Sequence, residues 1–140
     1  MNPVGLDHVV LRVADIDRAI RFYCEVLGCR VEKRQEAIGL IQLRAGRCLI
    51  DLVDIAGKIG REGGKAAGVE GRNMDHFCIR IEPFDGKAIQ AHLKSHGVDP
   101  GEVVKRFGAE GDGPSIYLTD PEGNAIELKA VMTADQQSIG

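Results

Sequence analysis

The stretch LDHVVLRVADIDRAIRFYCEVLGC, residues 6–29, decides the fold, because a second stretch, MDHFCIRIEPFD at residues 74–85, repeats its beginning. The Leu-Asp-His tripeptide that opens the first stretch is answered by Met-Asp-His in the second, and the match continues at Arg12 with Arg80. Internal similarity of this kind indicates a supersecondary unit that occurs twice. The chain is therefore predicted to contain two copies of one module.

The first module is predicted to have the order β-α-β-β-β. Val9, Leu11 and Val13 recur at every second position, as the period of two in a strand requires. Asp15 can cap a helix that ends at Gly28, since Asp is favoured before the first helical turn and Gly after the last. The predicted elements are a strand at 6–13, a helix from 15 to 28, and strands at 29–34, 38–44 and 47–53.

The second module repeats this order. Its predicted elements are a strand at 75–82, a helix at 85–96, and strands at 102–106, 115–119 and 124–130. The modules therefore cover about residues 5–54 and 74–130 of one α+β domain spanning 1–140. The glycine-rich residues 55–73 between them are either a flexible linker or a mobile loop over a site.

The composition excludes several classes of protein. The chain has 140 residues, a net charge of −3, 4% aromatic residues and no Trp, and it lacks the basic stripe or stacking rings of a nucleic-acid surface. No apolar run approaches the roughly 20 residues that span a bilayer, and the N-terminus is unlike a signal peptide. We therefore expect no nucleic-acid or membrane partner and a cytoplasmic location. The four cysteines form no C-x-x-C pair, which predicts reduced and mostly buried thiols.

Two histidines and two arginines are predicted to share one face of the sheets. If each helix covers the face that carries Val9, then His8 and Arg12 point to the opposite, concave face, because side chains alternate along a strand. The repeat places His76 and Arg80 on the same face of the second module. A single histidine in a strand is more often a hydrogen-bonded core or rim residue than a metal ligand. Here, however, that explanation would have to apply independently to a histidine at the same position of both modules.

Two acids are predicted to point the same way. Asp51 stands between apolar residues in the last strand of the first module, and Glu127 does so in the second. An unpaired ion loses several kcal/mol of solvation when it is buried, and a bound metal removes that cost. Imidazole nitrogens and carboxylate oxygens suit Zn, Ni, Fe(II), Co or Mn. His8, Asp51, His76 and Glu127 are therefore predicted to bind a divalent metal.

The segments that open the two modules, together with CLIDLVD at 48–54 and IYLTDPEGNAIEL at 116–128, resemble the vicinal-oxygen-chelate superfamily. This superfamily includes glyoxalase I, methylmalonyl-CoA epimerase, fosfomycin-resistance thiol transferases, bleomycin-resistance proteins and extradiol dioxygenases. The resemblance covers about residues 5–130, is that of a single-domain bacterial-type member, and is specific for the superfamily rather than for one reaction. It implies a glyoxalase-like fold, in which two βαβββ modules pair into a half-open eight-stranded barrel.

The resemblance also implies roles for the four predicted ligands. His8 and His76 match the histidine ligands of glyoxalase I, and Glu127 matches its last glutamate ligand. Asp51 takes the place of the other glutamate, but it is one methylene shorter, so it reaches the metal directly, through water, or only supports another ligand. In enzymes of this kind the metal stabilises an enediolate or oxyanion while a carboxylate moves a proton. Glu127 and Asp51 are the candidates for that catalytic carboxylate.

Three further residues are candidates for substrate binding. Arg12 and Arg80 stand on the predicted concave face, and Tyr117 is expected beside Glu127 across the last hairpin. Tyr117 could orient the substrate, although a rim aromatic that packs on the sheet is an equally good interpretation.

Several functions fit this pattern. The first is a metal-dependent lyase or isomerase acting on a small oxygenated or thiol-conjugated metabolite. A thiol transferase of the fosfomycin-resistance type needs the same two histidines and glutamate, whereas a bleomycin-resistance-like protein binds a small molecule without metal chemistry. An extradiol dioxygenase ranks last, because no additional acid-base residues can be identified. A homodimer is expected, since two such sheets leave edges and apolar surface to cover.

Overall fold

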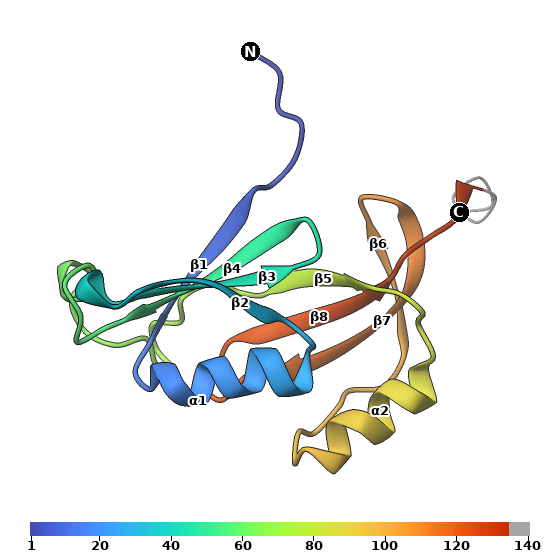
Figure 1. The fold of residues 1–140 in the computed structure, drawn as a ribbon. Helices are drawn as coiled ribbons and strands as arrows, with labels where there is room; N and C mark the ends of the chain where they lie inside the picture. The colour runs from blue at the N-terminus through green and yellow to red at the C-terminus, as the bar shows by residue number, and fades with distance from the viewer. Residues whose placement is uncertain (135–140) are drawn as a thin grey trace. The chain divides into compact units, whose positions relative to one another are not determined.

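The computed structural model describes residues 1–134, which divide into two units. The first unit comprises Met1–Asn73 together with Pro121–Gly123, and the second comprises Met74–Asp120 and the chain from Asn124 onward. Each unit contains one four-stranded sheet (Figure 1). The α+β class and the duplicated module are therefore confirmed, and the pairing of the two sheets into one barrel stays a prediction.

The first unit forms a mixed sheet in the order β1-β4-β3-β2. β1 runs parallel to β4, whereas β3 is antiparallel to both of its neighbours. A parallel pair needs a long crossover, and here the helical segment and the β2–β3 hairpin supply it. The elements are β1 (His8–Val13), β2 (Arg30–Gln35), a 3-10 turn η2 (Glu36–Ile38), β3 (Leu40–Ala45) and β4 (Cys48–Asp54).

The helical segment begins as expected and ends differently. Asp15 caps α1 (Ile16–Arg21), because its carboxylate accepts a 3.0 Å hydrogen bond from the backbone N–H of Arg18. The helix then widens into a π-helical turn, η1 (Phe22–Val26), and Gly28 follows with a φ of 78°. The sequence predicted one regular helix, since apolar spacing over so few residues does not distinguish α from π hydrogen bonding.

The core of the first unit lies between this helical segment and one face of its sheet (Figure 1). Tyr23 is fully buried, and its ring meets the Phe22 ring edge-on with 5.1 Å between centroids. The buried strand residues on this face include Leu11, Val13, Ile41, Leu43, Ile50 and Leu52. Residues that alternate with these point to the opposite face, as the period-two pattern predicted.

The second unit repeats the arrangement in the order β5-β8-β7-β6, with β5 parallel to β8. Its elements are β5 (Phe77–Ile81), α2 (Gly86–Ser95), β6 (Val104–Gly108), β7 (Gly111–Thr119) and β8 (Ala125–Ala130). β7 begins four residues before the predicted start at residue 115, because the turn-like residues 111–114 pair with β6. Its buried apolar residues include Leu93, Ile116, Leu118, Ile126 and Leu128.

The glycine-rich segment between the modules is folded against β1 and contains a 3-10 turn, η3 (Gly60–Gly63). The Arg12 guanidinium donates hydrogen bonds to the carbonyl oxygens of Gly60, Gly64 and Lys65, at 3.0, 2.7 and 3.0 Å. A Cβ at Gly63 would lie 2.4 Å from Arg12 Nε, so a side chain there would displace the arginine. Asn73 Nδ2 donates a 3.0 Å hydrogen bond to the Arg12 carbonyl oxygen, so Arg12 holds the segment both at residues 60–65 and at its last residue.

No helix within residues 1–134 is long and apolar enough to cross a membrane. All four cysteines carry free thiols. Cys29 is buried, Cys24 and Cys48 are half-buried, and Cys78 is exposed. The prediction that most thiols are buried is wrong, since only Cys29 is buried and Cys78 points to the face of β5 opposite to the core.

Candidate functional site

His8 begins β1 on the face opposite to the helix of its own unit. Its Nδ1 atom lies 2.7 Å from Oδ1 of Asp7, the residue before it. This hydrogen bond raises the pKa of His8 above its ordinary value, because the carboxylate stabilises the imidazolium and outweighs the opposing desolvation. When a carboxylate holds the Nδ1 proton of a histidine, Nε2 is left as the metal-binding nitrogen.

Asp51 lies beside Val10 in the parallel register of β1 and β4 and is only 3% exposed. Its Oδ2 accepts a 3.1 Å hydrogen bond from Gln42 Nε2, and Gln42 Oε1 accepts a 3.0 Å hydrogen bond from Gln35 Nε2. Its Oδ1 is buried and has no hydrogen-bond partner within residues 1–134. Leaving such an atom unsatisfied costs about 1–3 kcal/mol, so this oxygen suits a bound cation or a ligand that donates a proton.

The second unit repeats the aspartate–histidine pair. His76 Nδ1 lies 2.6 Å from Asp75 Oδ1, and this hydrogen bond is the main reason that the pKa of His76 is raised. The other ring nitrogen, Nε2, lies 3.3 Å from Oε2 of Glu127. The histidine and the acid that the sequence predicted as ligands in this module are therefore brought together.

Glu127 is buried in β8 with 6% of its surface exposed. Its Oε1 accepts a 2.6 Å hydrogen bond from the hydroxyl of Ser115, which is fully buried in β7. Both carboxylate oxygens thus have a partner, one a hydroxyl and the other the His76 ring. The carboxylate is held in one orientation on the face opposite to α2.

Tyr117 stands directly opposite Glu127 in the register of β7 and β8, as the sequence predicted. Its ring meets the His76 ring edge-on with 5.6 Å between centroids. The guanidinium carbon of Arg106, in β6, lies 5.6 Å from the centroid of the Tyr117 ring. Tyr117 therefore contacts the predicted ligand His76 and an arginine that the sequence had not singled out.

The two arginines predicted to bind substrate are both engaged by protein groups. Arg12 donates to the carbonyl oxygens of the glycine-rich segment. Arg80 Nη1 lies 3.2 Å from Oε2 of Glu110, at the tip of the β6–β7 hairpin. Arg12 is a positioning residue for that segment, and direct contact of either arginine with a substrate stays a prediction.

Each sheet presents one histidine and one buried carboxylate on the same face. Within the described part of the chain, no group of three or more His, Cys, Asp or Glu side chains could hold a metal ion. The four-ligand site of His8, Asp51, His76 and Glu127 therefore stays a prediction. The donor set fits a divalent metal, since imidazole nitrogens and carboxylate oxygens are its usual ligands and Asp51 keeps a buried oxygen without a partner.

Sequence reasoning missed the residues that hold the two carboxylates. Gln42 is opposite Asp51 in the β3–β4 register, and Ser115 is two residues before Tyr117 on the same face. Both follow from strand register, which alternation within one strand does not provide. The aspartates before the two histidines could have been identified from the sequence, because the Asp-His dipeptide is part of the repeat.

Comparison with known proteins gives a match over nearly the whole chain. A model of the Glyoxalase/Bleomycin resistance protein/Dioxygenase superfamily matches residues 5–128. The glyoxalase domain-containing protein RDO1 of Mycosarcoma maydis is 31% identical over 135 residues, which cover 93% of this chain and 70% of that protein.

A second relative is similar in sequence and in structure. The virulence protein STM3117 of Salmonella typhimurium is 34% identical over 125 residues, covering 88% of this chain and 81% of that protein. Its crystal structure matches with a TM-score of 0.74 and 28% identity, covering 94% of this chain and 100% of that one. A probable lactoylglutathione lyase of Synechocystis sp. is 23% identical over 134 residues, covering 86% and 91% of the two chains. The relatives share the module and differ in their described roles.

Proposed function

The chain belongs to the glyoxalase/bleomycin resistance protein/dioxygenase superfamily, and we propose that it is a metal-dependent lyase or isomerase acting on a small oxygenated or thiol-conjugated metabolite. One duplicated observation supports this: in each sheet, a histidine whose Nδ1 is held by the preceding aspartate shares a face with a buried carboxylate. Proteins orient metal-binding histidines in this way. In this proposal His8, His76 and Glu127 bind a divalent metal, and Asp51 is a fourth ligand or supports one.

The proposed chemistry divides between the metal and the protein. A bound divalent metal supplies Lewis-acid polarisation of a substrate oxygen. Glu127 then transfers the proton, because its carboxylate is buried and oriented by Ser115 and His76. Asp51 is the second candidate for this transfer, since its Oδ1 is buried without a donor within residues 1–134. Tyr117, next to His76, orients the substrate.

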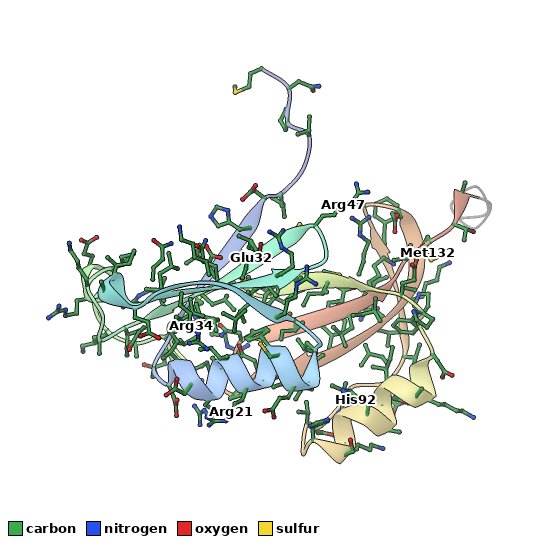
Figure 2. The ribbon with its side chains drawn as sticks, viewed as in Figure 1. Arg21, Glu32, Arg34, Arg47, His92 and Met132 are labelled. Atoms are coloured by element: carbon green, nitrogen blue, oxygen red, sulfur yellow. The ribbon has the colours of Figure 1, made fainter. Side chains whose placement is uncertain are left out.

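Elemental analysis of the purified protein tests the metal directly. We expect about one equivalent of Zn, Ni, Fe, Co or Mn per site, lost in the variants His8→Ala, His76→Ala and Glu127→Ala and reduced in Asp51→Ala. His92→Ala is the matched control, because His92 is an exposed histidine of α2 (Figure 2). Full metal content in both histidine variants would end the metal-site proposal.

A substrate panel tests the reaction. Metal-dependent exchange of a carbon-bound substrate hydrogen with deuterated water, lost in Glu127→Gln, would support the lyase or isomerase. The panel contains the hemithioacetal of methylglyoxal and glutathione, acyl-CoA epimers, fosfomycin with a thiol, and catechols. A metal-loaded protein that is inert to all of them but binds a small molecule would favour the bleomycin-resistance-like alternative, and turnover of fosfomycin would favour the thiol transferase.

We also propose a homodimer. Within its own sheet, each of β1, β2, β5 and β6 pairs with a neighbour on one side only. Edge strands of this kind are usually covered in native assemblies. Val10 in β1 and Phe107 in β6 are 45% and 82% exposed, which adds apolar surface at two of these edges. Light scattering at micromolar concentration is expected to give twice the monomer mass, and a stable monomer would contradict the proposal.

A further inference from the structure

Arg106 lies on the same face of the second sheet as Glu127. It is opposite Gly113 in the β6–β7 register, and alternate residues from Gly113 lead along β7 to Tyr117, which is opposite Glu127. Residues directly opposite one another in an antiparallel pair point to the same side. The side chain thus extends toward Tyr117, with the guanidinium carbon 5.6 Å from the ring centroid.

Tyr117 connects this arginine to the proposed metal ligands. The centroid of the His76 ring lies 5.6 Å from that of the Tyr117 ring, and Nε2 of the same histidine lies 3.3 Å from Oε2 of Glu127. Glu127 and Arg106 therefore lie on one face of the sheet, and Tyr117 neighbours both of them. A substrate whose reactive oxygens lie beside Glu127 would therefore meet Arg106 only with a more distant group.

The charge of Arg106 is not neutralised by the protein. Two other basic side chains of this sheet are paired, since Lys105 Nζ lies 3.3 Å from Asp112 and Arg80 Nη1 lies 3.2 Å from Glu110. Arg106 instead donates one 2.9 Å hydrogen bond to the carbonyl oxygen of Lys105. No carboxylate within residues 1–134 forms an ion pair with it.

A buried lysine adds a second positive charge beside Arg106. Lys129 is 4% exposed, and its Nζ donates a 2.6 Å hydrogen bond to the Arg106 carbonyl oxygen. The ammonium packs against Gly113, which has no side chain to displace it, since a Cβ there would lie 3.0 Å from Nζ. In the described residues Lys129 has no ion pair with a carboxylate, although a buried charge without a counter-charge loses several kcal/mol of solvation. Arg106 in β6 and Lys129 in β8 thus both lack an ion pair with a carboxylate among residues 1–134.

We propose that Arg106 and Tyr117 form a subsite for a substrate carboxylate, so that the substrate is a small acid with its carboxylate remote from the reacting oxygens. This assignment rests on the proposed function for the reactive end of the substrate. A carboxylate matches the planar fork of a guanidinium, which can donate two parallel hydrogen bonds to it. The buried Lys129 ammonium strengthens the attraction without contacting the ligand.

Calorimetric titration of the zinc-loaded protein with matched probes tests the subsite. 2-Oxoglutarate and 2-oxoadipate carry a second carboxylate, whereas 2-oxopentanoate and 2-oxohexanoate end in a methyl group instead. Hydrogen bonds between charged groups predict that at least one diacid binds about 10- to 100-fold more tightly than its methyl partner. Arg106→Gln should reduce this ratio to about one while leaving the metal content and the affinity for the methyl probe unchanged. Arg30→Gln, at an exposed arginine of β2, should preserve the ratio.

A ratio near one for both pairs in the wild-type protein, or a ratio that survives Arg106→Gln, would overturn the subsite. A second measurement does not depend on the metal. Titration of the metal-free protein with glutarate should shift the ring proton resonances of Tyr117, and the shift should disappear in Arg106→Gln. If the protein binds no metal but this shift is found, the proposed enzyme function fails and the carboxylate subsite stands.

Discussion

The two sheets share one strand order and one aspartate–histidine pair, but they hold their carboxylates differently. Asp51 accepts one hydrogen bond, from the side-chain amide of Gln42, and its other oxygen is buried without a donor in residues 1–134. Glu127 has a partner for each oxygen, the Ser115 hydroxyl and the His76 ring. The repeated backbone thus determines which face an acid occupies, and the residues on the neighbouring strand determine what that acid can do.

The largest expected effect is a difference in reaction rate between variants of the two carboxylates. If the oriented acid transfers the proton, Glu127→Gln should lower the rate of substrate deuterium exchange about 100- to 10,000-fold, the usual contribution of a general base. If Asp51 only supports a ligand, Asp51→Asn should lower it less, by about tenfold. Exchange followed by mass spectrometry measures both, with Glu25→Gln, at an exposed residue of η1, as control. The opposite ranking would assign proton transfer to Asp51.

The next effect concerns the hydroxyl that holds Glu127. Ser115→Ala removes the donor to a buried carboxylate, so we expect the free energy of unfolding to fall by about 1–3 kcal/mol. Gln42→Ala should have a smaller effect, since Gln42 is only half-buried. Urea unfolding at pH 7 measures both, and Ser95→Ala, an exposed serine, should stay within about 0.5 kcal/mol of the wild type. Equal losses in both site variants would show that the two carboxylates are held alike.

The helix starts of the two units also differ. Glu122 accepts hydrogen bonds from the backbone N–H groups of Ala14 and Asp15, at 2.6 and 3.1 Å, just before α1. Among the described residues, α2 is capped by Asp85 alone, whose carboxylate accepts a 3.1 Å hydrogen bond from the backbone N–H of Ala88. We expect Glu122→Ala to lower the free energy of unfolding by about 2 kcal/mol and Asp85→Ala by about 1 kcal/mol. Urea titrations decide this, and a larger loss for Asp85→Ala would contradict it.

The smallest effect is a pH dependence in the first unit. Burial raises the pKa of the Cys29 thiol to about 11, so the folded state favours the protonated thiol. This contribution to stability is complete below the ordinary thiol pKa of 9.0 and is lost as the pH rises toward 11. Relative to Cys29→Ala, the wild type should lose about 1 kcal/mol between pH 8 and 10. Parallel pH profiles for the two proteins would contradict the raised pKa.

Alternation predicted which faces the strands bury, and therefore the placement of Asp51 and Glu127. It predicted neither the π-helical turn at Phe22–Val26, because apolar spacing does not distinguish α from π hydrogen bonding, nor the start of β7 at Gly111, because that start is set by pairing with β6. For the same reason Gln42, Ser115 and Arg106 were missed. Each of these residues contacts a side chain on a neighbouring strand, and the sequence repeat does not show which residues of two strands lie opposite each other.

The contacts of Arg12 also determine where residues can be inserted into the chain. The side chain and the carbonyl oxygen of this arginine fix the segment at Lys65 and Asn73, so the mostly exposed residues 66–72 form a small closed loop with both ends anchored on β1. Doubling the length of such a loop costs only about 0.6 kcal/mol in closure entropy. A peptide tag or protease cleavage site inserted there would leave the anchored turn intact, whereas an insertion between Gly60 and Lys65 would separate the carbonyl oxygens that surround the guanidinium.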